Sequence, residues 1–182
     1  MFKKVSVAGT MVVLLLLSVG RAFAQTTVVL PDTSQVTTLT ATVSEQARIT
    51  VPSGVTFNVA DTANSTASSN VSLAISNVVL STATKQLRVA IQADAASFTP
   101  PVAGATTWSA SNVSWNAASW TAATGAIGTL SGSAYNTVAT CDAGAAACST
   151  SGLVFTLGAN SAVQRSGNHT LVIRWRLEST GS

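Results

Sequence analysis

The stretch Leu171-Val172-Ile173-Arg174-Trp175-Arg176-Leu177-Glu178 decides the fold class of this chain. From Ile173 onward, apolar side chains alternate with charged ones. Successive side chains of a β-strand point to opposite faces, so this period of two predicts a strand with one buried and one solvated face. Trp175 is expected in the core. The charged face, Arg174, Arg176 and Glu178, is interpreted as gatekeeper residues that discourage unwanted strand pairing, with a binding stripe as the alternative.

The same alternation recurs along most of the chain. Strands are predicted wherever apolar side chains share one parity and turn residues, such as Pro52-Ser53-Gly54, separate the runs. The runs cover residues 39–43, 47–51, 55–59, 71–79, 87–91, 113–115, 126–130, 153–157 and 171–177. No window after residue 24 carries the spacing of an amphipathic helix. We therefore predict an all-β protein, an antiparallel immunoglobulin-like (Ig-like) β-sandwich, with a closed barrel as the alternative.

The first 24 residues have the order of a secretory signal peptide. A basic start, an apolar run and a small-x-small cleavage site follow one another at Lys3-Lys4, Val12 to Leu17 and Ala22-Phe23-Ala24. Cleavage leaves about 158 residues, 25–182, which we expect to form a single β-sandwich domain. The exported product is expected in the periplasm, at the cell surface or outside the cell. No membrane span is predicted in it, because the one long apolar stretch lies in the signal.

Charges balance outside the predicted signal peptide. The whole chain carries nine basic and six acidic residues, but three of the basic residues lie in the first 24 positions. A near-neutral chain without a basic cluster lacks what nucleic acids and anionic membranes require, so neither is expected as a partner. A charge-poor surface does little to prevent association, which favours contact with copies of the same chain, other surface proteins or a polysaccharide.

The two cysteines, Cys141 and Cys148, enclose the six residues Asp-Ala-Gly-Ala-Ala-Ala. A lone pair at short range in an exported protein typically forms a disulfide. Closing so short a loop stabilises the fold by roughly 2–3 kcal/mol in the chain-entropy model. The alternatives are a redox pair or two metal ligands, but redox motifs are more closely spaced and a zinc site needs further ligands. We predict a structural disulfide.

Three tryptophans, Trp108, Trp115 and Trp120, lie within thirteen positions among Ser, Asn and Ala. Trp115 alternates with Val113 on a predicted strand and is expected to face the core. Trp108 and Trp120 fit either the core or an exposed position where an aromatic ring stacks on a sugar. They are the candidate ligand-stacking residues of an alternative hypothesis, a carbohydrate-binding module.

No constellation of residues predicts catalysis or a cofactor. His169 is the only histidine, and Ser166 beside it has neither an orienting acid nor a predicted oxyanion hole. The six acids are dispersed, and no cluster of His, Cys and acidic residues has the spacing of a metal site. We expect no enzyme activity, no catalytic residue, no metal and no cofactor.

Two segments and the predicted strands together carry a family resemblance. These segments are the Thr/Val-rich opening, Val36 to Val43, and the closing run, Gly167 to Trp175. With the signal peptide and many short strands, they resemble secreted bacterial β-sandwich surface proteins of the spore-coat-U and fimbrial-subunit type. The resemblance spans most of the mature chain and implies assembly by strand donation, with an arm at Thr26 to Leu30 as donor. Val28, Val29 and Leu30 are then the candidate assembly arm.

We therefore predict a non-enzymatic, exported structural or adhesive cell-surface protein that serves as a subunit of a surface assembly. Its edge strands and N-terminal arm would supply contacts by β-augmentation, in which an extended segment adds a strand to a sheet edge.

Overall fold

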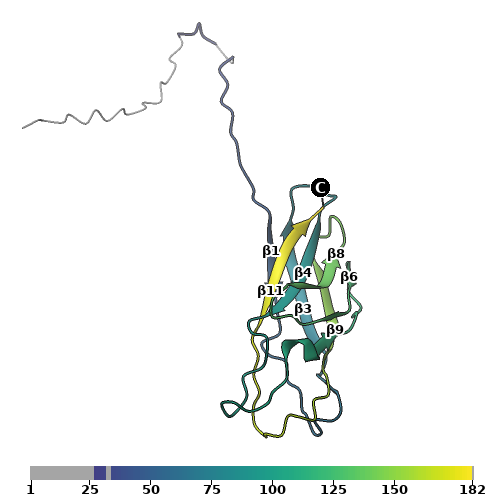
Figure 1. Ribbon diagram of the computed structural model, residues 1–182. Helices are drawn as coiled ribbons and strands as arrows, with labels where there is room; N and C mark the ends of the chain where they lie inside the picture. Colours follow the sequence, from purple (N-terminus) through teal and green to yellow (C-terminus); the bar gives the residue numbers. More distant parts are fainter. Residues whose placement is uncertain (1–26, 32–33, 182) are drawn as a thin grey trace, which may run out of the picture. The chain divides into compact units, whose positions relative to one another are not determined.

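The computed structural model describes residues 27–31 and 34–181 (Figure 1). The predicted signal peptide and Thr26 lie outside the described residues. Residues from Thr42 onward form one compact unit, and residues 27–31 and 34–41 belong to another. These N-terminal residues contain no strand. Their largest apolar side chains are almost fully exposed, namely Val29, Leu30, Val36 and Leu39.

Residues 42–181 are nearly all β, as predicted, and form three antiparallel sheets (Figure 1). Sheet A has the order β1 (Gln46–Thr50), β3 (Val71–Val79), β9 (Cys148–Leu153). Sheet B has the order β2 (Thr66–Ala67), β10 (Phe155–Leu157), β5 (Val113–Trp115), β7 (Gly128–Thr129). Sheet C has the order β11 (Ile173–Thr180), β4 (Gln86–Ala93), β8 (Asn136–Cys141), β6 (Ala123–Gly125). The only helical element of the described residues is the 3-10 turn η1 (Ala110–Asn112).

The predicted alternation is confirmed in the long strands. In β3 the side chains of Val71, Leu73 and Ile75 are buried, and the serine and alanine between them are exposed. β11 pairs with β4 along its whole length, from Ile173 opposite Ala93 to Thr180 opposite Gln86. The parity of a strand decides which face is buried, so this continuous register places Trp175 and Leu177 on the inner face.

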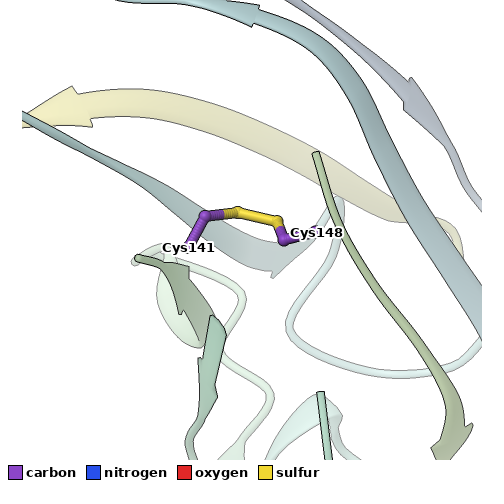
Figure 2. Close-up of a disulfide and its surroundings, with 2 residues drawn as sticks. All are labelled: Cys141 and Cys148. Carbon is purple, nitrogen blue, oxygen red and sulfur yellow. A yellow bond between two sulfur atoms is a disulfide. The ribbon is translucent and has the colours of Figure 1, made fainter. Parts of the chain in front are cut away.

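Buried side chains form two clusters. The first cluster contains Leu73, Ile75, Leu87, Val89 and the two cysteines, so it joins sheet A to sheet C. The Cys141–Cys148 disulfide lies inside it and links β8 to β9, with the two Cα atoms 5.9 Å apart (Figure 2). The predicted disulfide is therefore present. The second cluster gathers larger rings, Phe98, Trp108, Trp115 and Phe155, with aliphatic residues of β4, β5, β8 and β10.

Four parts of the strand prediction differ from the structure. Residues 55–59 keep the predicted alternation but pair with no strand, and residues 39–43 are exposed without pairing. The predicted strand at 153–157 is broken at Val154 into β9 and β10, which belong to different sheets. β8 was not predicted, because Val138 is its only large aliphatic side chain and small residues surround it. It is a strand because both of its edges are paired, with β4 and with β6.

Candidate binding groove

An apolar groove of about 1330 Å³ lies between two segments that flank the second cluster. One wall is formed by residues 51–60, which follow β1, and the other by residues 163–173, which lead into β11. Buried side chains of the second cluster line the groove between the walls, namely Phe98, Trp108, Val113, Leu130, Phe155 and Leu157. The groove therefore lies next to the end of β1, an edge strand of sheet A, and the start of β11, an edge strand of sheet C.

The wall at residues 51–60 is an extended segment without a partner strand. Val55, Phe57 and Val59 are half-buried and pack against the second cluster, while Thr56 and Asn58 are exposed. Within the described part of the chain, residues 52–60 make no backbone–backbone hydrogen bond. The segment thus has the alternation of a strand but not its ladder.

The opposite wall is a loop held at its two ends. Val163 donates its N–H to Asn160, and Thr170 exchanges a pair of backbone hydrogen bonds with Thr99. Between them, residues 164–169 make no backbone–backbone hydrogen bond to any described residue. Gly167 has a φ of 125°, and a Cβ there would lie 2.8 Å from the Cβ of Pro101, so this turn of the wall requires glycine.

Unpaired backbone beside half-buried apolar side chains is the chemistry of a strand-binding edge. Backbone N–H and C=O groups need a partner or water, and an exposed extended segment offers them as a template for another chain. The apolar lining residues could contact every second side chain of such a bound segment. What this groove can do is bind an extended, apolar piece of polypeptide.

His169 lies in the groove wall, and both nitrogens of its ring make hydrogen bonds. Its Nδ1 lies 2.8 Å from Oγ1 of Thr107, and its Nε2 lies 3.1 Å from the backbone oxygen of Arg165. The ring meets Trp108 edge to face, with centroids 5.1 Å apart. No Asp or Glu belongs to the described lining, so neither a general-acid pair nor a triad with Ser166 is assembled here.

The structure places the tryptophans largely in the interior. Trp115 is 3% exposed, which confirms its predicted core position. Trp108 is 5% exposed and donates its indole N–H to the oxygen of Gly158, so it presents no free face for stacking on a sugar. Trp120 is half-buried, packs against both clusters, and has a shielded indole nitrogen without a partner. Of the two candidate stacking rings, Trp108 is therefore buried, and Trp120 is partly exposed.

A cluster of charged residues lies on the outer face of sheet C. Arg174 binds Asp94, and this hydrogen bond raises the pKa of the Arg174 guanidinium. Glu178 binds Arg88 and Arg176, and the hydrogen bond from Arg88 is the main cause that lowers the pKa of Glu178. Since β11 is an edge strand, these pairs are in the position that the gatekeeper interpretation requires.

Glu45 fastens the beginning of β1 to the turn between β3 and β4. Its carboxylate accepts the backbone N–H of Ser81 at 2.8 Å and pairs with Nζ of Lys85 at 2.9 Å. Hydrogen bonding to Ser81, followed by that to Lys85, lowers the pKa of Glu45 to about 2. β1 is an edge strand and has no neighbouring strand on one side. The polar contacts of Glu45 therefore help to hold its beginning in place.

No protein-family model, curated protein or solved structure matches this chain. In the described residues, no helix has the length and hydrophobicity needed to cross a bilayer, and no three metal-ligating side chains come together. The candidate arm residues Val29 and Leu30 are 91% and 83% exposed, and Val28 is partly exposed.

The groove was not predicted from the sequence, although the apolar residues of its walls were recognised there. The period-two run Val55, Phe57, Val59 was correctly identified as apolar on one face, and the same holds for the approach to Ile173. That residues 52–60 and 164–169 lie across one groove from each other without backbone pairing depends on segments more than a hundred positions apart, which periodicity cannot show.

Proposed function

We propose that this protein is a non-enzymatic, exported structural subunit of a surface assembly, built as an immunoglobulin-like β-sandwich with one open edge. The observation that carries the proposal is the groove, with its apolar lining and with residues 52–60 and 164–169 of its walls making no backbone–backbone hydrogen bond to any described residue. The disulfide supports export to an oxidising compartment, because such bonds persist there.

The occupant that fits the groove best is the N-terminal arm of a second copy, here taken as residues 34–44 rather than the predicted Val28, Val29 and Leu30. Residues 34–44 carry no charge, as suits a lining without carboxylates. Leu39 and Val43 share one parity and are 93% and 71% exposed. These two side chains are therefore available for contact with the apolar groove of a neighbour.

The arm is expected to act on a neighbour rather than on its own domain. To run beside β1, it would have to reverse direction within residues 42–45, Thr-Val-Ser-Glu, where Ser44 is the single residue of a type that dominates turns. Glu45 is also bound to Ser81 and Lys85. An arm given to the next subunit makes a head-to-tail contact, which produces open filaments when it does not close into a ring.

The test is light scattering of the cleaved, oxidised protein from dilute to concentrated solution. We expect species larger than a monomer that grow with concentration. Leu39→Asp should abolish them, because a carboxylate would enter the apolar groove. Thr40→Asp is the matched control: its side chain has the opposite parity and should leave assembly intact. A strict monomer in the unmodified protein at high concentration overturns the proposal.

A further inference from the structure

We propose that His169 makes occupancy of the groove depend on pH: an apolar segment binds while the imidazole is neutral and is released when the imidazole takes up a proton. The inference rests on the proposed function, because it concerns the same groove, and it adds regulation by acidity.

The hydrogen bonds of His169 define its neutral form. The backbone oxygen of Arg165 can only accept, so Nε2 carries the hydrogen that it donates there. Nδ1 of the neutral ring then accepts from the hydroxyl of Thr107. With Trp108 packed edge to face against it, the neutral ring can be covered by a bound segment without leaving a polar atom unpaired.

Nothing in the described lining balances a charged ring. Arg165 is the only other charged side chain there, and its sign is the same. The acids closest to the lining in sequence are engaged elsewhere. Asp61 accepts from the N–H of Ala63 and from Nδ2 of Asn64, and Asp94 is paired with Arg174.

Protonation therefore opposes binding in two ways. The Thr107 hydroxyl must turn from donor to acceptor, and a bound apolar segment would cover a positive charge that water otherwise solvates. Histidine is the side chain that typically changes charge between about pH 5 and 8, so the test compares two pH values inside this range. If the occupied groove excludes the proton, affinity should fall about tenfold between pH 7.5 and pH 5.5.

The experiment uses the full mature chain and, as probe, a labelled peptide with the sequence of residues 34–44 and blocked termini. This peptide has no titratable group, so any pH dependence arises in the protein. Fluorescence anisotropy should show binding about tenfold weaker at pH 5.5 than at pH 7.5. In His169→Gln the affinity should be the same at both pH values. Arg165→Gln is the matched control and should keep the pH dependence, because Arg165 accepts the hydrogen bond of the ring with its backbone oxygen, which the substitution retains.

A second measurement needs no variant. The chain has one histidine, so one imidazole signal is followed by NMR. By reciprocity of linked equilibria, saturating peptide should shift the titration of this signal to lower pH. Equal affinity at both pH values, a pH dependence that persists in His169→Gln, or an unmoved titration overturns the inference while leaving the proposed function intact. No peptide binding at any pH overturns both.

Discussion

Two sides of the same domain differ in how their backbone is paired and how fully their apolar side chains are buried. On one side, Thr121 exchanges backbone hydrogen bonds of 2.8 and 3.2 Å with Ser149 of β9, and the disulfide joins β8 to β9. Sheets A and C are thereby connected, and the side chains between them are almost completely buried. On the other side, β1 and β11 are edge strands, and the walls that extend from them leave backbone unpaired and apolar side chains half-buried.

The contrast separates stability from interaction. Where the Thr121–Ser149 hydrogen bonds and the disulfide connect the sheets, an apolar residue is buried by its own chain and stabilises the fold. Where the ladder is missing, an equally apolar residue keeps part of its surface in water, and burying the rest requires another polypeptide. Mutations of the same chemical type should therefore have unequal effects on the two sides.

The largest difference is expected between Leu73→Ala and Leu171→Ala. Leu73 is 0% exposed within the first cluster, so its truncation leaves a cavity and should cost about 3–5 kcal/mol of unfolding free energy. Leu171 is half-buried in the groove wall, so its truncation should cost only about 1 kcal/mol of unfolding free energy. Urea denaturation measures both. Equal losses would show that the groove side is as closed as the other.

Two glycines offer a second contrast. A Cβ on Gly128 would lie 2.2 Å from Cζ2 of Trp115, so Gly128→Ala should destabilise the domain by about 1–3 kcal/mol through overpacking. Gly54, in the groove wall, has nothing within 4 Å of a built Cβ, and Gly54→Ala should change stability by less than about 0.5 kcal/mol. Thermal unfolding compares the two variants. A neutral Gly128→Ala would contradict this packing of β7 on Trp115.

A smaller effect distinguishes two buried tryptophans. Trp108 donates its indole N–H to Gly158, whereas the indole nitrogen of Trp115 has no partner. Both Trp→Phe changes remove similar volume, but only Trp108→Phe leaves a carbonyl unpaired. We expect it to cost about 1 kcal/mol more than Trp115→Phe in chemical denaturation. A larger loss of stability in Trp115→Phe than in Trp108→Phe would contradict this assignment of the paired and unpaired indole N–H groups.

The smallest effect is expected from acid at the start of β1. Because the folded pKa of Glu45 is lowered from 4.5 to about 2, its stabilising contribution is complete above pH 4.5 and is lost as the pH falls toward 2. Glu45→Gln should therefore reduce the dependence of the melting temperature on pH in this range. Asp142→Asn, which removes a carboxylate outside the described ion pairs, is the control and should reduce it less.

Sequence reasoning recovered the parts of the fold in which side chains alone decide. The alternation in β3, β4 and β11 predicted both the strands and their buried faces, and Trp115 and the disulfide were placed correctly. β8 and the break at Val154 were not predicted, because strand pairing with distant neighbours, rather than local composition, defines them.

By itself, the sequence determined the all-β class, the inner faces of the long strands and the covalent link, since period-two patterning and a lone cysteine pair are local properties. Only the tertiary structure decided that Trp108 is covered, that His169 lies against it, and that residues 51–60 face a wall more than a hundred positions away without a strand between them. The physical reason is that burial and backbone pairing are long-range. An apolar run looks the same in the sequence whether its own chain covers it or leaves it open.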